Sequence, residues 1–356
     1  MKSQLVFVVN TQQEFWRREF GGTIVEKDEK FLDSLRDLIN RGLRPIVQID
    51  NDHAELGHLK TLPKNSIIGW CHSDEKFDLA FNQELAKIDA FKLILRPYKL
   101  EKINLVNSWL SLLYTVLNLQ SARNLVEILR TLRWQLRGYS MQFRQAKILK
   151  MFSRTNKKFY NIPIGYTNIF ALSLASKLQI SPNQSLISST GLNDAIHETR
   201  ITFVGQSGQI VREFAIRAAE SSPNGWVVRR SGYGASNVID STVSSRGSDY
   251  IDQIAASRFV LSPPGNISGE SFRTYEAMIM NRIPLVLDHI TSDPNFKSYY
   301  KYLNAFKSKR NWRQFLAEAL KIDNRTIHQI INENSEAAKS EVEALKRILI
   351  EANISY

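Results

Sequence analysis

The sequence predicts an α/β protein built from two doubly wound domains. In the first half, short apolar runs alternate with amphipathic segments of helix length, as at residues 5–9, 29–41 and 45–50. This alternation is typical of parallel sheets covered by helices. A strand, helix, strand order returns at residues 258–287. At 356 residues, the chain is long enough for two domains of ordinary size.

The composition indicates a globular protein of a reducing compartment. Hydrophobic residues make up 43% of the chain, which excludes an intrinsically disordered protein. Cys71 is the one cysteine in the sequence, so no internal disulfide can form. The apolar run at residues 5–9 is too short for a signal peptide, and Asn and Ser interrupt the apolar segment 103–119. We therefore expect a cytoplasmic protein without a transmembrane helix, peripheral on the inner membrane face.

The first half is expected to begin with a strand at residues 5–9 and a loop at residues 10–22. A helix at 29–41 follows, because apolar residues recur there at helical spacing and Gly42 can end it. The next expected elements are strands at 45–50, 66–70 and 91–95, a helix at 77–88, and a last strand at 158–165.

The net charge of +12 is concentrated in residues 120–160, which are expected to belong to a helical region over 105–150. Ten basic residues stand there against one acidic residue, a local charge of +9: Arg123, Arg130, Arg133, Arg137, Arg144, Lys147, Lys150, Arg154, Lys157 and Lys158, against Glu127.

Apolar residues line one face of the same helix: Leu125, Ile128, Leu129, Leu132, Leu136 and Tyr139. One interpretation is a cationic, solvated face on a packed helix. A second is a surface that docks on anionic lipid or on a lipid-diphosphate acceptor. Nucleic-acid binding is a third, although no recognised motif supports it.

The second half is expected to open with a strand at 201–204 and a helix at 209–219. Gly205 and Gly208 lie between them and permit close backbone approach to a ligand. Arg212 falls in the first turn of the helix, where a guanidinium can reach a phosphate. Later elements are expected to be strands at 226–230, 258–261 and 283–287 and helices at 250–256, 271–281, 315–320 and 326–352.

The loop between the strand at 258–261 and the helix at 271–281 is the main candidate ligand site. In open parallel sheets, ligands bind beyond the carboxyl ends of strands, against helix amino termini. Ser268, Gly269 and Ser271 offer small side chains and backbone N–H groups there. Arg273 can grip phosphate oxygens, and Glu276 shares its helix face. This set is typical of a nucleotide-sugar site.

Two segments carry a resemblance to a known family. The run SRFVLSPPGN…SFRTYEAMIMNRIPLVL at 257–287 resembles the donor-site signature of the exostosin-like glycosyltransferases, and RITFVGQSGQIVRE at 200–213 is similar to that family's FFxGxxxxxxR segment. Asn281 stands where the family often has Gly. The resemblance covers about residues 200–294, and no motif is recognised in the amino-terminal half.

The resemblance implies a GT-B fold, in which two Rossmann-like doubly wound domains face a cleft. The expected domains are an acceptor-side domain at 1–190, with a basic helical insertion at 105–158, and a nucleotide-sugar-binding domain at 191–356 with terminal helices. The donor substrate would be a nucleoside diphosphate sugar, with a UDP-sugar as the expected form. No further cofactor and no metal are expected to be required.

The residues expected to bind the donor are Gly205, Gln206, Gly208, Arg212, Pro264, Gly265, Ser268, Gly269, Glu270, Ser271, Arg273 and Glu276. Arg273 and Glu276 are also expected to be catalytic, through the leaving diphosphate and the donor sugar. His72 and Asp74 are the candidates for a base that activates the acceptor, and His53 is a weaker one. Asp50 and Asp52 form an Asp-x-Asp triplet that can hold a divalent metal, although a solvated strand end explains it as well.

The resulting prediction is a glycosyltransferase that acts on a glycan or lipid-linked glycan acceptor in cell-surface polysaccharide synthesis. The expected partners are the donor, this acceptor and an anionic membrane surface contacted through 120–160, and no nucleic acid is expected. Two alternatives stay open: a nucleotide-sugar epimerase or phosphorylase of GT-B architecture, and a non-catalytic basic protein that binds membrane or nucleic acid.

Overall fold

The chain divides into two compact units. Unit 1 comprises residues 1–103, 140–164 and 341–356, and unit 2 comprises 104–139 and 165–340. The computed structural model describes residues 5–10, 13–50, 52–72, 77–97, 116, 119–155, 158–162, 165–189, 200–205, 209–229, 250–263, 272–286 and 311–354.

The units divide the chain differently from the expected domains, 1–190 and 191–356. Residue 190 lies outside the described residues, and residues 165–189 belong to unit 2. Helices α6 (Leu125–Phe152) and α14 (Asn324–Ile354) each contribute residues to both units.

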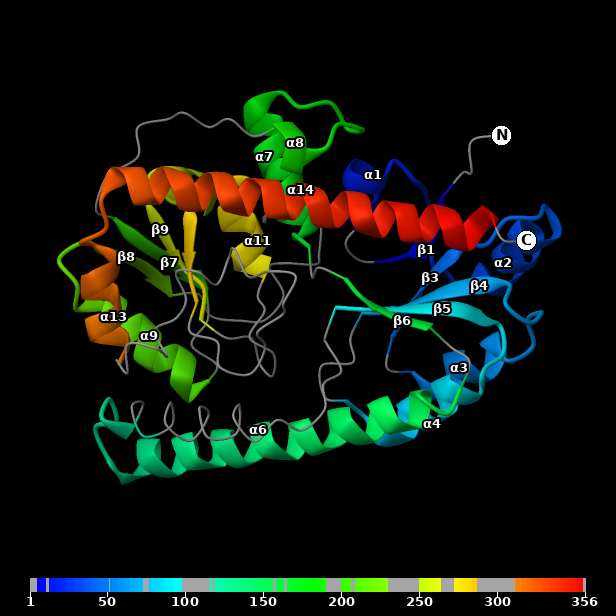
Figure 1. Ribbon diagram of the computed structural model, residues 1–356, viewed down its shortest axis with the longest axis horizontal. Helices are drawn as coiled ribbons and strands as arrows, with labels where there is room; N and C mark the ends of the chain where they lie inside the picture. Colours follow the sequence, from blue (N-terminus) through cyan, green and yellow to red (C-terminus); the bar gives the residue numbers. More distant parts are fainter. Residues whose placement is uncertain are drawn as a thin grey trace. The chain divides into compact units, whose positions relative to one another are not determined.

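Unit 1 contains a parallel sheet with six described strands in the order β2-β1-β3-β4-β5-β6 (Figure 1). The strands are β1 (Val6–Val9), β2 (Thr23–Glu26), β3 (Ile46–Ile49), β4 (Ile67–Cys71), β5 (Phe91–Arg96) and β6 (Lys158–Asn161). The apolar runs of β1, β3 and β4 are buried throughout, as expected of parallel strands covered on both faces.

Helices α1 (Gln13–Phe20), α2 (Phe31–Asn40), α3 (His53–Leu59) and α4 (Leu79–Lys87) alternate with these strands. The loop expected at residues 10–22 is wrong, because α1 occupies most of it. Trp16 and Phe20 lie one turn apart on α1, and their ring centroids are 4.9 and 6.3 Å from that of Phe7 in β1. These aromatic contacts bury one face of α1 against the sheet.

Unit 2 contains a parallel sheet with four described strands in the order β10-β9-β7-β8. They are β7 (Ile201–Gly205), β8 (Gly225–Arg229), β9 (Phe259–Leu261) and β10 (Ile283–Leu285). Described helices of this unit include α7 (Asn168–Leu178), α8 (Leu186–Ser189), α9 (Ile210–Glu220), α11 (Phe272–Ile279) and α13 (Trp312–Ala319), and residues 250–255 are helical as well. The chain is therefore a mixed α/β protein with two parallel sheets, as predicted.

The strand orders place a topological switch point in each sheet. The chain goes from β1 to β2 on one side and then to β3 on the other, and it goes from β7 to β8 and then to β9 in the same way. Ligands of open α/β sheets bind outside the carboxyl ends of the strands at such points. The edges after β1 and β3, and after β7 and β9, are thus the places to look for a site.

Candidate functional site

Arg273 of α11 lies at the carboxyl end of β7, at the switch point of the four-stranded sheet. Its Nε donates a hydrogen bond to the backbone carbonyl of Val204 at 2.9 Å. The guanidinium carbon is 5.1 Å from the centroid of the Phe203 ring, a distance at which the ring attracts a cation. Two residues of β7 therefore fix a cation at the end of the strand.

Gly205 makes room for this guanidinium. A Cβ atom added at Gly205 would lie 2.1 Å from Nη2 of Arg273, and the residue has a φ of +150°. Side chains other than hydrogen are strained at that φ and would overlap the guanidinium. The glycine of one predicted motif and the arginine of the other therefore meet at one point of the fold.

Glu276 lies one turn after Arg273 and is buried, with 3% of its surface exposed. One carboxylate oxygen accepts a hydrogen bond from the Thr167 hydroxyl at 2.8 Å, and the other accepts one from the Tyr250 hydroxyl at 2.6 Å. Burial raises the pKa of Glu276 above 4.5, and the bonds from Tyr250 and Thr167 and the charge of Arg273 oppose this effect. Glu276 thus joins α11 to the start of α7 and to Tyr250.

The remaining donor-site residues are placed as follows. Arg212 is a partly buried residue in the first turn of α9. Two residues outside the predicted set connect β9 to α11: the hydroxyl groups of Ser262 and Thr274 are buried and share a 2.9 Å hydrogen bond. The predicted residues that lie outside the described part of the chain are Gln206, Gly208, Pro264, Gly265, Ser268, Gly269, Glu270 and Ser271.

A second polar cluster lies at the carboxyl edge of the six-stranded sheet. The ammonium group of Lys27, which follows β2, is 2.7 Å from a Glu55 carboxylate oxygen and 3.4 Å from one of Asp50. It also donates to the backbone carbonyl of Gln48 at 3.0 Å. Glu55 is buried, its Oε1 atom makes no hydrogen bond, and burial raises its pKa above 4.5 against the pull of Lys27.

His72 follows β4 at the same edge, as the sequence predicts for a candidate base. Its ring is 5.0 Å from that of Trp70. Burial lowers its pKa below 6.5, with the nearby Asp50 charge opposing this shift, so the imidazole is neutral at pH 7. A neutral imidazole can accept a proton. Asp74, the other candidate, lies outside the described residues.

The structure gives local roles to the remaining polar candidates of unit 1. Asp52 caps α3 by accepting a hydrogen bond from Ala54 N–H at 2.9 Å. His53 is half exposed and lies 3.2 Å from a Glu84 oxygen. In the described part of the chain, no group of three or more His, Cys, Asp or Glu residues could hold a metal ion.

Sequence reasoning missed Thr167, Tyr250, Lys27 and Glu55. A signal existed for Thr167 alone, because a threonine before an apolar helical run is a typical N-cap and its hydroxyl does accept from Phe170 N–H. The bond to Glu276 joins residues far apart in the sequence, so no local pattern indicates it.

No protein-family model matches this sequence, and a search of curated proteins finds no match either. The fold places the chain in a broad class, mixed α/β proteins with two parallel, Rossmann-like sheets. No described helix has both the length and the hydropathy to cross a membrane.

Proposed function

We propose that this protein is a glycosyltransferase of GT-B architecture that uses a nucleoside diphosphate sugar as donor. One observation carries the proposal. Arg273, from the signature at 257–287, lies against Gly205, from the segment at 200–213, at the β7/β9 switch point. Two motifs that resemble one donor site in sequence therefore converge where an α/β sheet binds ligands.

A second detail supports the resemblance. Asn281, which stands where the exostosin-like family often has Gly, has a φ of +53°. This left-handed conformation favours Gly, and Asn tolerates it better than most residues. The substitution is thus the one that this backbone position accepts most readily.

In the proposed reaction, the acceptor oxygen forms a bond to the anomeric carbon of the donor sugar. The bond from that carbon to the diphosphate breaks, and its electron pair leaves with the diphosphate. Arg273, helped by Arg212 and the N–H groups at the starts of α9 and α11, stabilises the charge that develops. These groups supply that stabilisation without a metal.

On the acceptor side, His72 is the proposed base. Where the reaction inverts the anomeric centre, the acceptor hydroxyl must lose its proton to such a group. The imidazole at the edge of the six-stranded sheet is in the neutral form that such a base needs, because burial lowers its pKa. The proposed acceptor is a glycan or a lipid-linked glycan, and the proposed setting is cell-surface polysaccharide synthesis.

Thermal stabilisation by a panel of nucleoside diphosphates tests the donor site. A ligand at a hundredfold excess over its Kd adds about 2.7 kcal/mol to stability, which is visible as a rise in Tm. We expect one base to raise the Tm without a divalent metal. Arg273→Ala should abolish the rise, and Arg273→Lys should reduce it, because lysine keeps the charge but loses the planar fork.

Arg325→Ala is the control, since Arg325 is an exposed residue of α14. A rise in Tm that survives Arg273→Ala would overturn the assignment of the site. A rise seen only with divalent metal would point instead to Asp50 and Asp52. Release of nucleoside diphosphate only when a glycan acceptor is present would separate a transferase from an epimerase or phosphorylase.

A further inference from the structure

Helix α6 presents a row of large apolar side chains to solvent. Along one face, the exposed fractions are 68% for Leu125, 57% for Leu129, 42% for Leu132, 69% for Leu136 and 60% for Phe143. The four leucines are three or four residues apart, and Phe143 follows Leu136 after seven residues, which is two helical turns. All five positions therefore form one stripe on the helix. The stripe, called here the leucine face, is an unusual feature for a surface helix in water.

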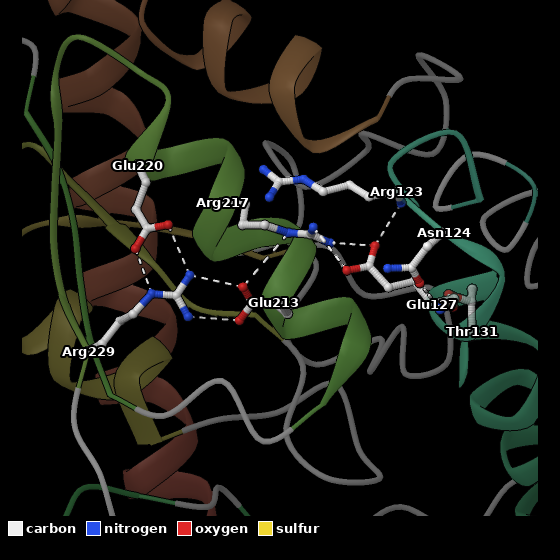
Figure 2. A network of polar contacts seen from close by, with 8 residues as sticks. All are labelled: Arg123, Asn124, Glu127, Thr131, Glu213, Arg217, Glu220 and Arg229. Atoms are coloured by element: carbon white, nitrogen blue, oxygen red, sulfur yellow. Dashed lines mark hydrogen bonds and ion pairs between the residues drawn. The ribbon is translucent and has the colours of Figure 1, made fainter. Parts of the chain in front are cut away.

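The opposite side of α6 is fixed to the rest of unit 2 (Figure 2). Glu127 and Arg217 of α9 form a two-pronged ion pair with both distances at 3.1 Å. Two turns further along α6, Trp134 donates from its ring nitrogen to the Gln209 side chain at 3.2 Å. These contacts set the rotation of the helix about its own axis, so the leucine face is held outward.

Arginines run beside the leucine face. Arg130, Arg133, Arg137 and Arg144 are all exposed, and their spacing places them in a second stripe along the flank of the first. An apolar stripe bordered by cations is typical of helices that lie in the interface of an anionic bilayer.

We propose that this face of α6 binds the surface of an anionic lipid bilayer, with the leucine face in contact with the acyl chains and the arginine stripe with lipid headgroups. The local charge of +9 over residues 120–160 favours this occupant over a second copy of the chain, which would bring two arginine stripes together. The leucine face favours a bilayer over nucleic acid, because a bound nucleic acid would contact the arginines through its phosphates and leave the apolar side chains in water. The proposal does not depend on the glycosyltransferase activity.

Flotation of the full chain with phosphatidylcholine vesicles, with and without phosphatidylglycerol, tests this surface. We expect binding only when phosphatidylglycerol is present, and weaker binding at high salt. Each arginine near such a surface contributes about a fivefold factor in partitioning, so Arg130→Gln/Arg133→Gln/Arg137→Gln should weaken binding roughly a hundredfold. Leu129→Ser/Leu136→Ser should also weaken it, although the net charge is unchanged.

Two matched controls separate this surface from general charge or hydropathy. Arg313→Gln/Arg325→Gln/Arg347→Gln removes the same charge from exposed positions on α13 and α14, and Leu172→Ser removes an exposed leucine of α7. Both controls should bind vesicles like the parent. Equal loss in test and control variants, or unchanged binding in both α6 variants, would overturn the proposal. So would a dimer in sedimentation velocity that Leu129→Ser/Leu136→Ser dissociates.

Discussion

At the scale of single residues, two features of Gly205 disfavour any larger residue there. Its φ of +150° and the 2.1 Å approach of Arg273 to the position of an added Cβ act together. We expect Gly205→Ala to lower the free energy of unfolding by about 1–3 kcal/mol and to abolish stabilisation by the nucleoside diphosphate. Chemical denaturation with and without nucleotide measures both effects.

Gly42→Ala is the matched control for Gly205→Ala. Gly42 also has a positive φ, +76°, but an added Cβ there meets no atom within 4 Å. This variant should show the cost of the backbone strain alone and keep its response to nucleotide. A Gly205→Ala protein that still responds to nucleotide would contradict the expected geometry of the donor site.

Because the carboxyl group of Glu276 is buried, we expect the free energy of unfolding to depend on pH. Burial raises its folded pKa above 4.5, so between pH 4.5 and that pKa the folded state holds a proton that the unfolded state has lost. The free energy of unfolding therefore falls as the pH rises through this range. Glu276→Gln should remove this part of the pH dependence, because its amide carries no charge to bury.

Urea denaturation of the parent and of Glu276→Gln across this pH range measures the difference. The two curves of stability against pH should diverge as the pH rises, with the parent losing more. Parallel curves would mean that the folded pKa of Glu276 is not raised. The same variant should lose nucleotide affinity if the carboxylate also binds the donor.

At the scale of elements, Lys27 ties the end of β2 to β3 and α3. Lys27 and Glu55 are both largely buried, with side chains 9% and 7% exposed. Removing one member of such a pair leaves an unpaired buried charge, which costs about 3–5 kcal/mol. We expect Lys27→Met to destabilise the protein by this amount.

The double variant Lys27→Met/Glu55→Met should recover most of that stability, because it leaves no buried charge behind. A double-mutant cycle measured by chemical denaturation checks the coupling. Additive effects of the two single substitutions would show that the pair is not an energetic unit. Arg36→Met is the control, since Arg36 and its partner Asp33 are both more than half exposed.

Of the features of the fold, the secondary structure could be predicted best from the sequence. The expected strands at 45–50 and 66–70 correspond to β3 and β4, because continuous apolar runs are typical of buried parallel strands. Helix α1 was missed because Glu14, Arg17 and Arg18 interrupt its aromatic residues and mask the helical period. Strand β2 was missed because it is short and half exposed.

Part of the candidate site could be predicted from the sequence. Arg273 and Gly205 stand out in sequence, since a glycine after an apolar strand and an arginine in a helix's first turns are local patterns. The hydroxyl groups of Thr167, the N-cap of α7, and Tyr250 come to Glu276 from distant parts of the sequence, and only the tertiary fold brings them there. The strand orders likewise depend on packing that no local pattern encodes.

At the scale of the whole molecule, sequence order and unit membership do not coincide. The chain passes between the units at residues 103/104, 139/140, 164/165 and 340/341. These units are not the two consecutive segments, with a boundary near residue 190, that the sequence predicts as domains. The interleaving arises because two long helices, α6 and α14, are each continuous while their residues belong to different units.

This interleaving bears on how the protein is made. The ribosome synthesises the chain starting at the amino terminus, and domains often fold in that order. Unit 1 begins first, yet its sixth strand, β6, comes from residues 158–161 and its last helical segment starts at 341. Unit 2 ends at residue 340, so the unit that starts later is complete earlier. While β6 is still untranslated, the edge of β5 to which it later pairs is unpaired. Because unpaired strand edges promote aggregation, we expect nascent unit 1 to need protection during synthesis.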